Sequence, residues 1–228
     1  MKTILKITIF CTVAFFTACK PAQHIVYDVN KYQPASERIN ASLSIQIFED
    51  IRQEFPDNQA QLTAKDNVAK INNDKSCVNA EKLYKTPVGQ QLADMLAKYL
   101  NKKAYFTRVV VNQNNMADYY VTAKVKYFTG HQKYSNKAAV GAQFGLVGAL
   151  ATMNLKTEGK IIIELAEIFV YDKAGNLVAQ VGEFKKEYDG DFPVDANCYC
   201  IYRNVNQSLA ELYEELGTIL FQEVKKSL

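Results

Sequence analysis

Histidines and acidic clusters, which often carry catalysis or bind metal ions, are sparse in this chain. The sequence holds two histidines, His24 and His131, so a general base or a metal site built on histidine has few candidates. Asp189, Asp191 and Asp195 could bind calcium through carboxylate oxygens, but their spacing lacks the EF-hand pattern and its closing glutamate. No G-x-S-x-G, H-E-x-x-H or phosphate-loop motif occurs. We therefore expect a protein that is not an enzyme, with no catalytic residue, cofactor or metal.

A cysteine near the N-terminus suggests a different chemistry, lipidation. The chain opens MKTILKITIFCTVAFFTACKP, with two lysines, then an apolar stretch, then small residues before Cys19, which is the order of a secretory signal peptide. The apolar stretch is shorter than the roughly 20 residues that cross a bilayer. Its ending, FTAC, resembles the lipobox of bacterial lipoproteins, in which the cysteine is lipidated and becomes the first mature residue. The alternative is an ordinary signal peptide cut near Ala18.

Lipidation at Cys19 would set both the organisation and the location of the protein. We expect a signal peptide over residues 1–18, a lipidated tether over residues 19–40 with two prolines, and one domain over residues 41–228. Acyl chains on Cys19 would hold the protein at a membrane surface. The expected location is the cell envelope, at the outer membrane and facing the periplasm.

The remaining cysteines of the mature chain favour a disulfide. Cys77, Cys198 and Cys200 are an odd number, which in an oxidising compartment implies one pair and one free thiol. Cysteines separated by one residue rarely pair, so Cys77 is expected to pair with Cys198 or Cys200. A thiolate metal site that combines these three with His131 is the less favoured alternative, because structural zinc sites normally show paired spacings and four ligands.

The charge of the mature chain gives no reason to expect nucleic-acid binding. Residues 1–18 hold two lysines and no acid, which leaves 25 basic and 24 acidic residues in the remainder. A net charge of +1 creates no general attraction for a polyanion.

The hydrophobic pattern predicts a single α+β domain. Strands are expected at residues 42–48, 104–111 and 118–128 and in a hairpin over residues 157–188 with a turn at DKAGN. Helices are expected over residues 86–103 and 205–228. The order is strand, helix, four strands, helix, which favours a four- to five-stranded, mostly antiparallel sheet with both helices packed on one face. A long polar stretch over residues 56–85 separates the first strand from the first helix.

An apolar run with regularly spaced glycines interrupts the predicted sheet. NKAAVGAQFGLVGALATMNLK lies between two strands, and its 16 residues from Ala138 to Met153 carry no charge. One interpretation is a crossover connection that packs on the core. The other is an exposed helical element that docks on a membrane surface or on a second copy of the chain. The candidate interaction residues are Gly141, Phe144, Gly145, Leu146, Val147, Gly148 and Leu150.

Tyrosines offer a second candidate contact surface. The chain has 14 tyrosines, and Tyr119, Tyr120, Tyr127 and Tyr134 fall on or beside one predicted strand. A tyrosine-rich face suits contact with a peptide, a glycan or a protein. Tyrosine is also simply a good strand former.

Several segments together resemble a group of small α/β lipoproteins of the bacterial envelope. They are PVGQQLADMLAKYL before a strand, ADYYVTAKVKYF, AAVGAQFGLVGAL, and IIIELAEIFVYDKAGNLVAQ before a last helix, all behind the lipobox-like cysteine. The group includes the curli-secretion lipoprotein CsgG, the penicillin-binding-protein activator LpoB, YajG-like lipoproteins and auxiliary lipoproteins of ABC transport systems. The resemblance implies a non-catalytic accessory or assembly role and transfers no site residues.

These observations predict a lipid-anchored envelope protein that binds a protein partner. A second copy of the chain is another expected partner. The alternatives are a lipoprotein with a cavity for a lipid or other small ligand, and an enzyme of unrecognised type.

Overall fold

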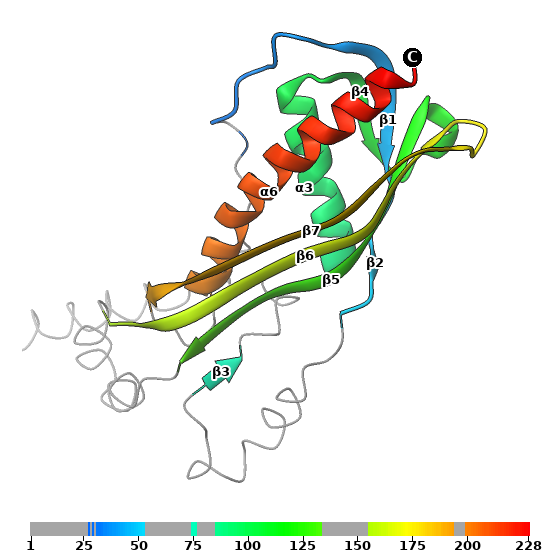
Figure 1. Cartoon of the computed structure of the whole chain (residues 1–228). Helices are drawn as coiled ribbons and strands as arrows, with labels where there is room; N and C mark the ends of the chain where they lie inside the picture. The colour runs from blue at the N-terminus through cyan, green and yellow to red at the C-terminus, as the bar shows by residue number, and fades with distance from the viewer. Residues whose placement is uncertain are drawn as a thin grey trace, which may run out of the picture.

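The computed structural model describes residues 27, 29, 31–52, 74–76, 85–133, 155–193 and 199–228, of which residues 74–76, 131–133, 157, 199 and 200 are described by their backbone alone. The elements are β1 (Ile39–Ile45), β2 (Glu49–Asp50), β3 (Asp74–Ser76), α3 (Val88–Lys103), β4 (Phe106–Val111), the 3-10 helix η2 (Asn114–Met116), β5 (Tyr119–Lys133), β6 (Lys156–Asp172), β7 (Leu177–Pro193) and α6 (Tyr199–Lys226) (Figure 1). Apart from the short β2, β3 and η2, this is the predicted order of one strand, a helix, four strands and a helix.

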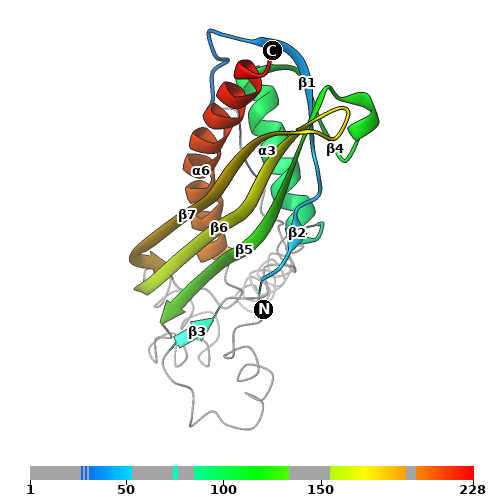
Figure 2. The same ribbon diagram turned by 45° about the vertical axis from the view of Figure 1, so that its right-hand side comes forward.

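The strands form one open, mixed sheet in the order β4-β1-β5-β6-β7. The three longest strands, β5, β6 and β7, pair antiparallel, whereas β1 pairs parallel with both β4 and β5. The short β2 and β3 add to β5. Both helices lie on one face of the sheet, as the two views show (Figures 1 and 2). The predicted α+β class, with a mostly antiparallel sheet and two packed helices, is confirmed.

Helix α3 forms because its apolar residues recur on one side. The period of these residues predicts one apolar side, and that side is buried, with Leu92, Met95 and Tyr99 fully inaccessible to solvent. The start of the helix differs from the prediction. Pro87 is the N-cap residue and no side chain caps the helix, because the Thr86 hydroxyl donates instead to the side-chain oxygen of Gln91, at 3.1 Å.

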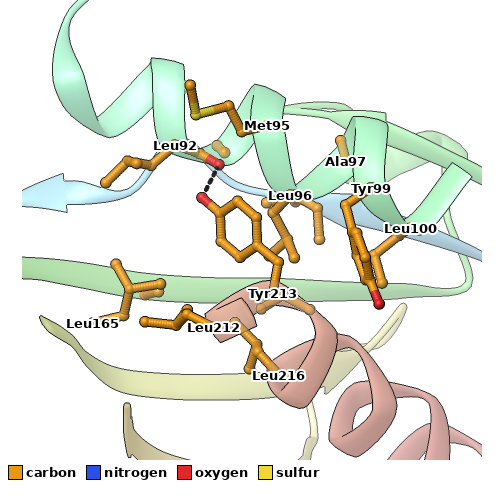
Figure 3. Close-up of a cluster of buried hydrophobic side chains, with 14 of the residues drawn as sticks. Leu92, Met95, Leu96, Ala97, Tyr99, Leu100, Leu165, Leu212, Tyr213 and Leu216 are labelled. Carbon is orange, nitrogen blue, oxygen red and sulfur yellow. Dashed lines mark hydrogen bonds between the residues drawn. The ribbon is translucent and has the colours of Figure 1, made fainter. Parts of the chain in front are cut away.

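Helix α6 packs against both the sheet and α3. The hydroxyl of Tyr213 donates to the backbone oxygen of Leu92, 2.7 Å away, within a cluster of leucines from both helices (Figure 3). Gly217 permits close approach of the helices, since a Cβ atom there would lie 2.7 Å from Cε1 of Tyr99. The described core is one cluster that combines these helices with the inner side chains of the sheet.

The first strand begins and ends earlier than predicted. Leu43 and Ile45 are buried as expected, but Ile47 is 46% exposed. The reason is that the chain turns after Ile45 to meet α3, where the Phe48 backbone N–H donates to the oxygen of Gly89 at 3.4 Å. A Cβ atom on Gly89 would lie 2.0 Å from the Phe48 oxygen, so this close approach requires glycine.

Strand β5 exchanges its faces partway along. Alternation along this strand predicts that Tyr119, Val121, Val125 and Tyr127 face the core. The first three do, but Phe128 takes the core position in place of Tyr127. The pairing of β5 with β6 shifts register between Thr122 and Lys124 and again before Tyr127. Such bulges reverse the alternation of side chains.

Candidate interaction surface

The face of the sheet that points away from α3 and α6, here called the outer face, is the candidate functional surface. On β5 and β6 its side chains alternate with core residues such as Val121 and Val170, which are fully buried. Directly paired residues of antiparallel strands lie on the same face, so Tyr120 and Tyr171 lie on it together. Neither helix covers this face (Figure 2).

A buried carboxylate occupies the middle of the outer face. Glu164 in β6 is only 4% exposed. Its carboxylate accepts a hydrogen bond from Nζ of Lys126, 2.6 Å away, and lies 4.0 Å from Nζ of Lys185. Lys126 also approaches Glu183, at 3.6 Å. The hydrogen bond to Glu164 raises the pKa of Lys126. The charge of Glu164 is thus compensated by two lysines from the neighbouring strands, as a buried charge requires.

Further ion pairs continue along the same face. Lys124 is 2.7 Å from Glu167, a residue with a positive φ of 49° at the register shift of β6. The carboxylate of Glu187 in β7 accepts hydrogen bonds from Nζ of Lys185, 2.6 Å away, and from Nζ of Lys160, 2.9 Å away. These hydrogen bonds lower the pKa of Glu187 to about 2. The outer face therefore carries alternating charges that are paired with one another.

The end of the outer face next to the β6–β7 turn is aromatic. The rings of Tyr120 and Tyr171 stack with centroids 5.0 Å apart and planes 17° apart, and Phe169 lies 6.3 Å from Tyr171. Leu177 pairs with Tyr171 across the hairpin and is 56% exposed. We call these four residues the aromatic patch. The three rings are half-buried, so part of each ring remains available for contact.

The turn beside the aromatic patch is fixed by its own hydrogen bonds. Both carboxylate oxygens of Asp172 accept bonds from Asn176, one from its backbone N–H and one from its side chain, each 2.8 Å long. Gly175 takes a positive φ of 89°, which glycine adopts without strain. The bonds from Asn176 lower the pKa of Asp172. This rigid turn holds Tyr171 and Leu177 in register.

Most of the residues singled out from the sequence lie outside the described part of the chain. These are His24, Cys19, Cys77, Cys198, Tyr134, Asp195 and the seven interaction candidates Gly141, Phe144, Gly145, Leu146, Val147, Gly148 and Leu150. Cys200 lies in the first turn of α6 and His131 in β5, both with backbone alone described. Their predicted roles stay predictions.

The predicted tyrosine group divides between the two faces of the sheet. Tyr119 points into the core, where its hydroxyl accepts a bond from Ser227 at 3.2 Å, whereas Tyr120 lies on the outer face. Asp189 and Asp191 are exposed in β7. Sequence reasoning missed Glu164, although a single acid within the apolar run IIIELA was a signal that could have found it.

Two kinds of feature do not occur among the described residues. They contain no group of three or more histidine, cysteine or acidic residues placed to hold a metal ion. None of their helices combines the length and the apolar character needed to cross a membrane.

Comparison with known proteins gives no family. No family model matches the sequence, and no curated protein matches it. Among solved structures, a protein of family model DUF330 from Xanthomonas campestris gives a TM-score of 0.49 at 10% identity, covering 86% of this chain and 94% of that one. The PelC dodecamer from Paraburkholderia phytofirmans gives 0.36 at 11% identity, with 80% and 91% covered. An uncharacterized lipoprotein B from Nitrosomonas europaea gives 0.34 at 11% identity, with 88% of each chain covered.

These likenesses are distant. All three TM-scores are below 0.5 and no identity exceeds 11%, so they assign neither a function nor a residue's role to this chain. None of the three carries the name of a family to which the sequence showed a resemblance.

Proposed function

We propose that the protein is a lipid-anchored accessory protein of the bacterial cell envelope, held at the outer membrane and facing the periplasm, that binds a protein partner and catalyses no reaction. The observation that carries the proposal is the signal-like N-terminus that ends in FTAC at Cys19, ahead of a folded α+β domain. A thioether-linked and acylated Cys19 would confine that domain to a membrane surface.

The outer face supports binding of a protein partner. Rigid tyrosine and phenylalanine side chains contribute large contact areas and lose little conformational entropy on binding, and they are enriched at protein interfaces. The aromatic patch combines Tyr120, Phe169 and Tyr171 with the exposed Leu177. The adjacent paired charges would form a polar rim around such a contact.

Binding of a lipid or small ligand between the sheet and the helices is the alternative function. The largest side chains in that layer include Tyr99, Tyr202, Tyr213 and Phe128, each less than 2% exposed, and they belong to one apolar cluster. This packing favours a contact on the surface over one inside the domain.

Anchoring is tested by metabolic labelling with an alkyne fatty acid in a bacterial host. The wild-type chain should be labelled and sediment with membranes, whereas Cys19→Ala should lose the label and appear in the soluble fraction. Cys11→Ala is the matched control and should behave as the wild type. Labelling that persists in Cys19→Ala would refute the lipid anchor.

Partner binding is tested by photo-crosslinking in cells with benzoylphenylalanine at single positions. Substitution at Tyr171 should give a discrete higher-mass adduct that depends on ultraviolet light. Substitution at Gln222, an exposed residue of α6, is the control and should give none. Adducts that form from Gln222 but not from Tyr171 would place the contact on the helices and refute the proposed surface.

A further inference from the structure

The segment just before β1 is docked on the two helices. Tyr27 is 6% exposed, and its ring meets that of Tyr213 in α6 edge to face, with centroids 5.9 Å apart. Tyr32 meets Tyr99 in α3 in the same way, at 4.9 Å. The rings of Tyr99 and Tyr213 lie 6.5 Å apart, so the two docked tyrosines sit where α3 and α6 meet.

The contacts also give the direction of this segment. The backbone N–H of Ala35 donates to the oxygen of Lys103, the last residue of α3, at 2.7 Å. Tyr32 contacts Tyr99, one turn earlier in α3. Tyr27 contacts Tyr213, whose hydroxyl is bonded to Leu92, near the start of α3. The contacts of Ala35, Tyr32 and Tyr27 therefore lie in this order from the end of α3 towards its beginning.

The docking depends on the rings and not on the Tyr27 hydroxyl. The hydroxyl oxygens of Tyr27 and Tyr99 are buried, and neither makes a hydrogen bond of good geometry, although the hydroxyls of Tyr32 and Tyr105 lie close enough to help raise their pKa. Burial raises the pKa of both phenols well above the ordinary range, so both are neutral at any physiological pH. Replacement of Tyr27 by phenylalanine should therefore preserve the contact, whereas replacement by alanine should remove it.

We infer that the segment that carries Tyr27, Tyr32 and Ala35 is a strap that fixes where the anchored N-terminus leaves the folded domain, so that the helices face the membrane and the outer face of the sheet points away from it. This inference rests on the proposed lipidation of Cys19. Tyr27 lies eight positions after Cys19, and a fully extended chain of eight residues spans about 28 Å. Without the strap, the 20 residues from Cys19 to Ile39 would span about 70 Å.

The short reach restricts the orientation of the domain. Helix α6, with 28 residues, is about 42 Å long, so the anchor chain is shorter than the molecule that it holds. To turn the sheet towards the membrane, the chain would have to pass from the helices around both layers of the fold. The aromatic patch is therefore presented to a partner on the side away from the bilayer.

The inference is tested with full-length, acylated protein in phosphatidylethanolamine and phosphatidylglycerol vesicles that carry an energy-transfer acceptor on some headgroups. A fluorescent amino acid is introduced at Gln222, exposed on α6, or at Gln180, which pairs with Phe169 on the outer face. Both positions lie towards the same end of the molecule, because Ser227 near the end of α6 bonds to Tyr119 at the start of β5. They differ in the face of the domain whose distance from the membrane they measure: Gln222 lies on the helical face and Gln180 on the outer face of the sheet.

Energy transfer to the headgroup acceptor should be stronger from the fluorescent amino acid at position 222 than from the one at position 180. This should hold in the chain that is otherwise wild type and in the Tyr27→Phe control. The difference should disappear in the double variant Tyr27→Ala, Tyr32→Ala, with the helical circular dichroism unchanged. If the double variant does not fold, a flexible insertion of about 12 glycine and serine residues before Tyr27 serves instead, because it lengthens the reach and keeps the strap.

Two results would overturn the inference. One is equal transfer from Gln222 and Gln180 in acylated wild-type protein; the other is a difference that survives in the folded double variant or after the insertion. Mass spectrometry of the same sample separates this failure from failure of the proposed function, since a Cys19 without acyl chains would refute the anchor itself.

Discussion

At the scale of single residues, the outer face depends most on Glu164. Its buried carboxylate is neutralised by Lys126 and Lys185. Glu164→Gln would remove that negative charge and leave a buried amide whose NH2 group cannot accept hydrogen bonds from the lysines. We expect a loss of about 1–3 kcal/mol in the free energy of unfolding, measured by urea denaturation. Glu183→Gln is the matched control, because Glu183 meets the same lysine at 3.6 Å but is 61% exposed.

The control should change stability by less than about 0.5 kcal/mol, as is usual for exposed ion pairs. Equal losses of unfolding free energy in the two variants would show that the burial of Glu164 does not increase its contribution to stability.

A second residue, Glu187, should make stability depend on acid. Its two lysine partners lower its pKa from 4.5 to about 2, so the folded state binds the proton less readily than the unfolded state. The stabilisation is complete above pH 4.5 and is lost as the pH falls towards 2. Wild-type protein should therefore lose thermal stability more steeply over this window than Glu187→Gln. Because Glu187 is exposed to solvent, 1 M salt should reduce the difference; identical profiles at low salt would contradict the assignment.

At the scale of elements, the contact between α3 and α6 depends on Gly217. A Cβ atom there would lie 2.7 Å from Tyr99 and 3.0 Å from Leu100. Alanine favours helix by about 1 kcal/mol over glycine, but displacement of two fully buried side chains should cost more. We expect Gly217→Ala to lower the free energy of unfolding by about 1–3 kcal/mol. Gln207→Ala, at an exposed position of the same helix, should leave stability unchanged or raise it slightly. A Gly217→Ala variant more stable than wild type would show that the helices can separate without cost.

Local periodicity was sufficient to predict that the helices and the long strands exist, although β5 continues to Lys133 and α6 begins at Tyr199, outside the predicted ranges. The stripe of α3 and the alternation of β5 depend on neighbours within a few residues, and both were found. The parallel pairing of β1 between β4 and β5 could not be predicted in this way, because it joins residues more than 60 positions apart, such as Leu43 and Val109. The exchange of Tyr127 for Phe128 in the core has the same origin, since it depends on register with β6.

The candidate surface was predictable only in part. Tyr120 was singled out from the sequence, but its stacking partner Tyr171 lies in the next long strand and becomes a neighbour only through antiparallel pairing. Tyr27 was assigned to an extended tether because its surroundings show no period, and its contact with Tyr213 depends on tertiary packing. In each case the missing information was which distant segments meet.

At the scale of the whole molecule, the C-terminal end of β5 contacts both β3 and the beginning of α6. The pairing of β3 with β5 places Ser76 opposite His131. The preceding residue of β5, Gly130, packs against the side chain of Ile201 in α6, because a Cβ atom there would lie 2.6 Å from it. In the sequence, Cys77 follows Ser76 and lies outside the described residues, and Cys200 precedes Ile201.

The odd number of cysteines in the mature chain predicts a disulfide between Cys77 and Cys200 or Cys198 in an oxidising compartment. A bridge that closes a loop of about 120 residues stabilises by up to about 5 kcal/mol in the chain-entropy model, because it restricts the unfolded chain. Non-reducing mass spectrometry of protein from the envelope should find Cys77 linked to one of the two, and Cys77→Ser should lower the thermal midpoint to that of the reduced wild type. Cys11→Ser is the control, because Cys11 lies within the expected signal peptide and should not affect the mature protein. Three free thiols in the isolated protein would refute the bridge. They would also show that no disulfide stabilises the contact of β3 and α6 with β5.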